Sequence, residues 1–235
     1  IFVTGLPIGY YASKYGVDID LLTRGAGFGY IGSTITSLIY ASFTFIFFAL
    51  EAAIMAMALE QLFHIPLSIG YLLSSLLVIP LVTHGITLIS RFQLWSQPLW
   101  VCLQLLPFIY IAWHDVASVE DWTQFEGSQQ ESGTGFNILL FGAASSVIFS
   151  LIAQIGEQVD FLRFLPARER VSAGRWWLAM LMAGPGWIGA GVLKIFAGSF
   201  LAVLALQHGI AAEDASDPTP MYRVAFGYIT QSPEF

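Results

Sequence analysis

Residues 30–59 read YIGSTITSLIYASFTFIFFALEAAIMAMAL, and Glu51 is the only charged residue among them. A helix of about 20 apolar residues crosses the hydrocarbon core of a bilayer. The segment therefore predicts a transmembrane helix that is longer than the bilayer needs and must tilt, break or project into the headgroups. Four further apolar stretches qualify as spans and a partial one opens the chain: 67–83, 94–113, 136–156, 176–206 and 1–11.

The composition supports the same class of protein. Of 235 residues, 56% are hydrophobic and 11% are charged, whereas soluble domains have about a quarter charged residues. The net charge of −7 argues against nucleic acid as a partner. The single cysteine, Cys102, excludes a disulfide framework and a cysteine zinc site. We therefore expect an all-α, polytopic helix bundle whose main partner is the lipid bilayer.

The few charges are sorted by sign along the chain. Lys and Arg occur in alternate connecting segments. They are present in 12–29, 84–93 and 157–175, and they are absent from 60–66, 114–135 and 207–220. The segments 114–135 and 207–220 are acidic. The positive-inside rule therefore places the basic loops in the cytoplasm, in a bacterial inner (plasma) membrane crossed several times. Arg223 is then the only basic residue on the outer side.

Three tryptophans stand at the ends of predicted spans. Trp113 ends one, and Trp176 and Trp177 begin another. Such positions are typical of an interfacial aromatic belt, so we expect these side chains to anchor the protein rather than to touch a solute.

Glu51 and Lys194 are the two charges that the sorting does not explain. Each lies deep within a predicted span, and an ionisable residue at that depth is a candidate for function. Both fall in the outer half of the membrane, so they could form a buried ion pair or line a polar cavity. The alternative is that each side chain snorkels or serves only packing.

Further candidates for a solute or ion pathway are uncharged polar residues inside the spans. Ser37 and Tyr40 lie on one polar face of the 30–59 helix, which could line a path or bind a neighbouring helix. Ser145, Ser146 and Gln154 belong to a small-residue span that could pack closely or unwind beside a site.

Two stretches match the dinucleotide fingerprint G-x-G-x-x-G, at 27–32 and 184–189. Neither lies between a strand and a helix, so nucleotide binding is rejected. Gly184-Pro185-Gly186, just before Trp187, instead predicts either a broken helix of the kind that forms transporter sites or a simple kink. No grouping of nucleophile and base and no metal-ligand spacing is present in the sequence, so we expect no enzyme activity from this chain and no metal site.

Two cytoplasmic segments resemble a known family. Lys14-Tyr15-Gly16-Val17 with Leu21-Leu22-Thr23-Arg24-Gly25 is similar to the loop before the third helix of the purine–cytosine permease (nucleobase–cation symporter-1) family. Asp160-Phe161-Leu162-Arg163-Phe164 resembles the signature that follows the sixth helix of that family, and Asp160 and Arg163 are its charged residues. A weaker likeness runs from Gly85 through Arg91 to Pro98.

The resemblance implies a leucine-transporter-like fold of two inverted repeats, of which this chain would hold about helices two to seven. It also implies a cation-coupled symporter that moves a small, nucleobase-like solute by alternating access. No cofactor is expected apart from the coupling cation, Na⁺ or H⁺. Family members usually carry a tryptophan in the third helix, where this chain has Ile31 or its neighbours.

A second resemblance leads to an alternative function. The run from Tyr40 to Met55 is similar to the permease-like membrane portion of some bacterial hybrid sensor histidine kinases. The chain begins and ends within apolar segments, so we expect it to be the middle of a longer protein, and a kinase module could follow Phe235. Transport and sensing are both carried forward as hypotheses.

Overall fold

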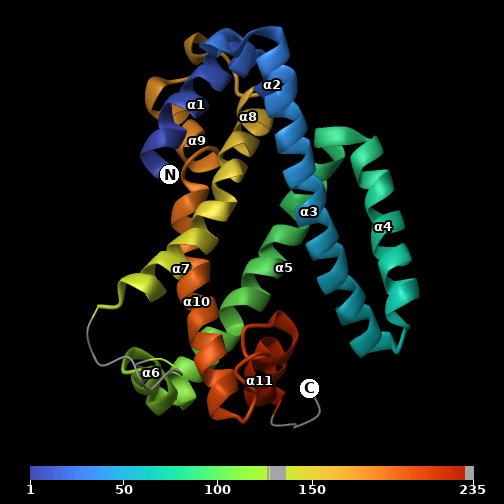
Figure 1. The fold of residues 1–235 in the computed structure, drawn as a ribbon, viewed down its shortest axis with the longest axis vertical. Helices are drawn as coiled ribbons and strands as arrows, with labels where there is room; N and C mark the ends of the chain where they lie inside the picture. The colour runs from blue at the N-terminus through green and yellow to red at the C-terminus, as the bar shows by residue number, and fades with distance from the viewer. Residues whose placement is uncertain (126, 128–135, 231–235) are drawn as a thin grey trace. The chain divides into compact units, whose positions relative to one another are not determined.

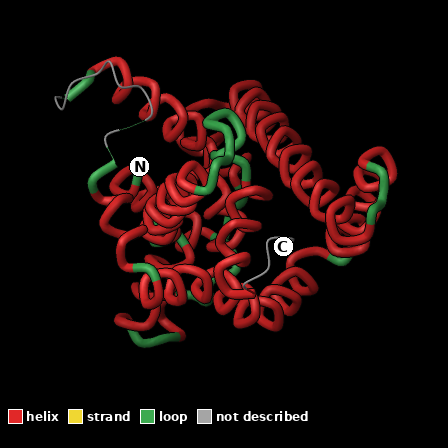
Figure 2. Tube along the Cα trace, turned by 90° about the horizontal axis from the view of Figure 1, so that it is seen from below, coloured by secondary structure: helices red, strands yellow, loops and turns green. Residues whose placement is uncertain are grey.

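A computed structural model describes residues 1–125, 127 and 136–230. All regular elements of that part are helices and no strand occurs in it, which confirms the all-α class (Figure 2). In chain order the elements are α1 (Phe2–Tyr15), α2 (Ile19–Thr23), η1 (Arg24–Phe28), α3 (Gly29–Phe63), α4 (Leu67–Thr83), α5 (Gly85–His114), α6 (Val116–Thr123), α7 (Ile138–Ser150), η2 (Leu151–Gly156), α8 (Glu157–Leu162), η3 (Arg168–Arg170), α9 (Ala173–Ala183), α10 (Trp187–Gln207) and α11 (Pro218–Thr230).

Within the described residues, three helical stretches are long and apolar enough to cross a membrane: Ile19–Phe63, Gly85–His114 and Trp187–Gln207. Only 6% of the most apolar window of the first is buried by the rest of the chain. Large apolar side chains such as Leu38 and Phe45 stay exposed on it. A soluble monomer rarely exposes so much contiguous apolar surface, and these helices indicate a membrane protein.

Helix boundaries depart from the predicted spans and loops at several places. The predicted span 136–156 is divided between α7 and η2, and the predicted loops 114–135 and 157–175 contain the short helices α6 and α8. The predicted 176–206 span is divided between α9 and α10, because Gly184 and Pro185 interrupt the helical path and Gly184 has φ −94° and ψ −120°. The predicted loop 84–93 is mostly helical, since α5 begins directly after His84. Arg91 adds a charge to its first turns, but no proline or glycine follows Gly85 until Pro98, so nothing ends the helix.

The helices form two compact units. Unit 1 contains Ile1–Phe47 and Ser132–Lys194, and unit 2 contains Phe48–Glu131 and Ile195–Phe235. Each is described by itself. Unit 1 therefore contains the predicted basic loops 12–29 and 157–175, whereas unit 2 contains the basic loop 84–93, the acidic loop 207–220 and most of the acidic loop 114–135.

The core of unit 1 joins α1, α8 and α9 (Figure 1). Val159, Leu162 and Met180 are buried there, and Trp176 is only 3% exposed. The indole nitrogen of Trp176 donates a hydrogen bond to the Pro166 carbonyl at 3.0 Å. The prediction that Trp176 anchors the protein at the lipid interface is therefore wrong, because its ring is packed inside the protein.

Close approach in this core depends on small residues. Gln158 is 1% exposed and its amide nitrogen donates to the Gly5 carbonyl on α1 at 3.2 Å. A Cβ added at Gly9 would lie 3.0 Å from Leu162 Cδ1, and one at Gly184 would lie 2.9 Å from the same atom. Without side chains at these positions, α1 and the break before α10 can both reach α8.

The core of unit 2 joins α5, α10 and α11, with Ile111, Phe200, Leu201 and Leu204 buried among them. Trp122 of α6 packs edge-on against Phe200, with ring centroids 5.8 Å apart.

The two acidic loops meet on this unit. The Gln207 amide donates to Asp121 at 3.0 Å, and the Tyr228 hydroxyl donates to Asp115 at 3.0 Å. In unit 1 the two basic loops also approach, since the Arg163 guanidinium lies 3.9 Å from the Asp18 carboxylate. This adjacency is what the predicted sidedness of the loops requires.

We expect Gly70→Val to destabilise the contact between α3 and α4. A Cβ at Gly70 would lie 3.0 Å from Ala56 Cβ and 3.2 Å from the Ala56 backbone, which cannot move aside. The cost is about 1–3 kcal/mol, as for overpacking in general, and appears as a lower midpoint of thermal unfolding in detergent. Gly198→Val is the control, because no heavy atom lies within 4 Å of a Cβ there; equal effects of both changes would contradict the prediction.

We expect the stability of unit 2 to depend on Asp115 in a pH-dependent way. Hydrogen bonds from the Ser118 hydroxyl, the Ser118 amide and the Tyr228 hydroxyl hold the pKa of this carboxyl below its usual value. The stabilisation is present above about pH 4, the ordinary range of an aspartate, and is lost as the pH falls further. At pH 7 the unfolding midpoint of wild type should be higher than that of Asp115→Asn. The difference between the two midpoints should shrink as the pH is lowered. A difference between the two unfolding midpoints that is the same at pH 7 and at pH 2.5 would contradict this prediction.

Candidate functional site

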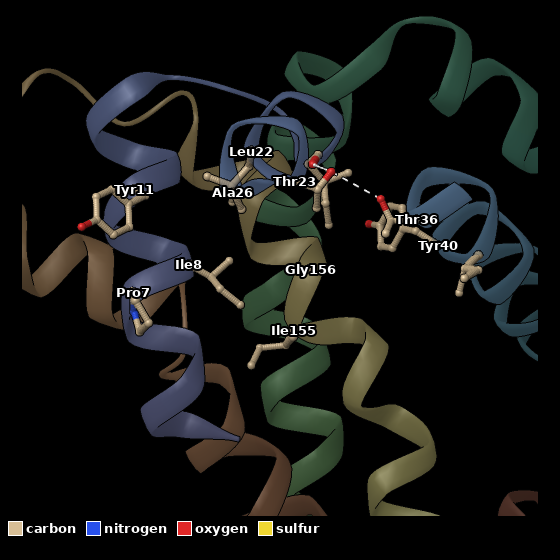
Figure 3. A pocket seen from close by; sticks show the side chains of 12 residues that line it. Pro7, Ile8, Tyr11, Leu22, Thr23, Ala26, Thr36, Tyr40, Ile155 and Gly156 are labelled. Atoms are coloured by element: carbon tan, nitrogen blue, oxygen red, sulfur yellow. Dashed lines mark hydrogen bonds between the residues drawn. The ribbon is translucent and has the colours of Figure 1, made fainter. Parts of the chain in front are cut away.

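A cavity of about 420 Å³ lies inside unit 1 between α1, α2, η1, α3 and the end of η2 (Figure 3). Aliphatic groups make up most of its wall, together with two tyrosine rings and two threonine hydroxyls. None of the described residues that line it carries a formal charge: Pro7, Ile8, Tyr11, Ile19, Leu22, Thr23, Ala26, Thr36, Ile39, Tyr40, Ile155 and Gly156.

Irregular backbone forms two sides of the cavity. On one side the chain kinks in η1, between α2 and α3, where Gly27 and Gly29 have φ angles of 107° and 65°. Such positive φ angles favour glycine, which has no Cβ. On the other side η2 winds as a 3₁₀-helix between α7 and α8. η2 falls within the predicted span 136–156, where non-helical backbone is tolerated if protein or a cavity covers it.

A pair of threonines supplies a polar edge. The Thr36 hydroxyl lies 3.3 Å from the Thr23 hydroxyl, as the dashed line in Figure 3 shows. The Thr23 hydroxyl also donates to the Ile19 carbonyl at 2.9 Å. Because each hydroxyl already donates its hydrogen to another oxygen, its own oxygen is left to act as an acceptor in a fixed position.

Tyr40 connects the cavity to α8. Its ring lines the cavity, and its hydroxyl donates a hydrogen bond to the Asp160 carboxylate at 3.1 Å. The partners are 120 positions apart in sequence. Asp160 therefore holds the Tyr40 ring in place from outside the cavity without adding charge to its lining.

Charged groups behind the threonines orient the N-terminal half of α3. Asp20 binds Arg24 at 2.5 Å and accepts from the Ser37 hydroxyl at 3.3 Å. The Arg24 Nε donates to the Ser33 hydroxyl at 3.4 Å. The Asp20 and Arg24 side chains are 35% and 38% exposed, and a pair that exposed contributes at most about 1 kcal/mol. The main effect of the pair is on geometry, since Asp20 and Arg24 also bind Ser37 and Ser33 and so tie α2 to α3 beside the cavity.

The structure brings two of the predicted pathway residues to this site. Tyr40 lines the cavity and Ser37 binds Asp20 behind it. Both family-signature residues are close: Asp160 binds Tyr40, and Arg163 lies 3.9 Å from Asp18, the residue that caps α2.

The other uncharged candidates lie elsewhere. Ser145 and Ser146 are in α7, and the Ser146 hydroxyl donates to the Ala143 carbonyl at 2.7 Å within that helix. Trp187 begins α10 and lines a separate cavity of about 220 Å³ with Gln158 and Phe161. Gln154 lies in η2, and its side chain is outside the described part of the structure.

Glu51 and Lys194 are not part of the cavity. Glu51 lies on α3 in unit 2 and Lys194 lies on α10 in unit 1. The predicted ion pair would join two units that are described separately, and it stays a prediction.

Sequence reasoning missed most of the cavity wall. Thr23 belongs to the Leu-Leu-Thr-Arg-Gly segment that resembles the permease loop, and its hydroxyl could have been singled out there. Tyr11 and Gly156 carry no signal in the sequence alone. Gly156 matters because a Cβ there would lie 2.6 Å from Ile19 Cδ1 and 3.7 Å from the Tyr40 ring, inside the cavity.

Comparisons with known proteins add no assignment. No protein-family model matches the chain, and neither a curated protein nor a solved structure is significantly similar to it. The site defines the class of protein only as a helical membrane protein with a small, mostly apolar internal cavity. Any more particular function rests on the geometry of the cavity.

We expect Tyr40 and Asp160 to be energetically coupled. Tyr40→Phe and Asp160→Asn should each lower stability by about 1.5–3 kcal/mol, the usual range for a hydrogen bond to a charged acceptor. The double variant should lose less than the sum, because the interaction is removed only once. Unfolding midpoints in detergent measure this cycle, with Tyr71→Phe on α4 as a control. Strict additivity of the two changes would show that the pair does not interact.

Proposed function

We propose that this chain is part of a secondary-transporter domain that binds a small, uncharged, nucleobase-like solute in the unit 1 cavity and moves it by alternating access. The observation that carries the proposal is an open, mostly apolar cavity bordered by the irregular turns η1 and η2. Broken helices at a solute site are a recurrent feature of transporters. The resemblance of 14–25 and 160–164 to the permease family supports it, because both segments border this site.

The lining restricts the class of solute. A volume of about 420 Å³ falls within the range of about 300–1,000 Å³ that is usual for small-molecule pockets. A charged solute would lose its hydration without gaining an opposite charge, at a cost of several kcal/mol or more. The Tyr11 and Tyr40 rings and the threonine oxygens instead suit a flat, neutral molecule with hydrogen-bond donors on one edge.

The arrangement also suggests how the cavity opens. Tyr40 is carried by α3, which lines the cavity, and Asp160 by α8, which lies behind it, so their hydrogen bond ties one wall of the site to α8. A movement of α3 away from α8 must break this bond. Gly27 and Gly29 sit at the start of α3, where backbone rotation is least restricted. We propose that α3 pivots there.

Closing the cavity with a side chain tests the proposal. Gly156→Leu should place its side chain against Ile19 and Tyr40 and abolish both uptake and binding of the solute. Gly156→Ala is the matched control, because its Cβ meets mainly the flexible end of Ile19 and should preserve both activities. Binding is read as a shift in unfolding midpoint with a panel of neutral heterocycles and charged solutes of similar size, where a ligand at 100 times its Kd adds about 2.7 kcal/mol.

The outcomes separate the hypotheses. A folded Gly156→Leu protein that still binds and transports would overturn the assignment of the cavity. Binding that is lost in Gly156→Leu, with no uptake in wild type, would favour a transporter-like sensor. If all panel shifts come from charged solutes, the proposed solute class is wrong.

A further inference from the structure

Arg223 is the one basic residue that the charge sorting leaves on the acidic side. It lies on α11 in unit 2, exposed, at the boundary of two neighbouring cavities. Its Nε and Nη2 atoms lie 2.9 and 2.5 Å from the side-chain oxygen of Gln61 when that amide faces it. Gln61 is neutral, and within the described residues no carboxylate comes within ion-pair distance of Arg223. The positive charge is therefore available to a ligand.

The two cavities differ in character but share Arg223 and Thr219. The larger, about 660 Å³, is mainly apolar and runs between the end of α3 and α11, with Ile54, Leu62 and Phe226 in its wall. The smaller, about 360 Å³, has a mixed polar and apolar lining that includes Asp214 and Asp217. An apolar groove that continues past a guanidinium into an acidic recess matches an amphiphile.

The position along the helices suits a lipid headgroup. The walls of the larger cavity come from residues near Phe63, where the candidate span Ile19–Phe63 ends. The smaller cavity is formed by the segment directly after Gln207, where the candidate span Trp187–Gln207 ends. Both spans thus end at the level where phospholipid headgroups lie.

We propose that these two cavities together bind a zwitterionic phospholipid with a terminal ammonium group. The phosphate binds Arg223 and the Thr219 hydroxyl, the ammonium lies near Asp214 and Asp217, and the glycerol and first methylenes of an acyl chain occupy the apolar cavity. A lipid with an anionic headgroup is disfavoured, because it offers no cation to the carboxylates of Asp214 and Asp217. A lipid with a quaternary ammonium is also disfavoured, because that group has no N–H to donate to the carboxylates. The site is separate from the unit 1 cavity and does not depend on the proposed transport.

The test is native mass spectrometry of the full chain, released from detergent with equal amounts of phosphatidylethanolamine, phosphatidylcholine and phosphatidylglycerol. Wild type should retain phosphatidylethanolamine in several-fold excess over the other two. Arg223→Gln should lose most of the retained lipid. Arg91→Gln is the matched control, because it removes an exposed arginine from the same unit at another site and should retain lipid like wild type.

A second variant tests the ammonium contact and does not depend on how Arg223→Gln folds. Asp214→Asn with Asp217→Asn should keep lipid binding but abolish the preference for phosphatidylethanolamine. Equal retention of the three lipids by wild type, or an unchanged preference in the double variant, would overturn the proposal. Phosphoethanolamine, the headgroup alone, should compete weakly. Competition as strong as that of the lipid would show that the apolar cavity holds no acyl chain.

Discussion

In a bilayer every backbone N–H and C=O must find a partner within the chain, and the structure of this protein depends on that constraint. Regular helices meet it locally, which is why all the regular elements of the described residues are helical. Irregular turns are acceptable only where protein covers them. Of the two irregular turns beside the unit 1 cavity, η2 falls within the predicted span 136–156, whereas η1 falls within the predicted cytoplasmic loop 12–29, where water can also pair with the backbone.

The distribution of charge gives the two units different characters. Basic loops meet in unit 1 through Arg163 and Asp18, and acidic loops meet in unit 2 through Asp115, Asp121 and their partners. Arg223, the basic residue that follows the acidic loop 207–220, lies at the border of an apolar cavity, and no carboxylate of the described residues is within ion-pair distance of it. A lipid phosphate would account for its position, since it is the one abundant anion at that depth.

Within unit 1, packing and function use the same elements. Glycines at positions 5, 9 and 184 let α1 and the α9–α10 break approach α8, and α8 in turn carries Asp160 to Tyr40. The buried amide of Gln158 is held by the Gly5 carbonyl on one side, whereas its oxygen has no hydrogen-bond partner. A buried acceptor without a partner costs about 1–3 kcal/mol, so this close packing is achieved at the expense of one hydrogen bond.

The sequence by itself determined which segments are helical and apolar, because both properties depend on neighbours within one or two helical turns. α4 covers 67–83, the range of one predicted span, and a break at Gly184-Pro185-Gly186 was one of its two possible interpretations. Only the tertiary structure decided that Trp176 is buried, that Thr23 faces Thr36, and that Tyr40 binds Asp160 across 120 positions. Such contacts depend on how distant helices pack, and no local pattern of residue types encodes that.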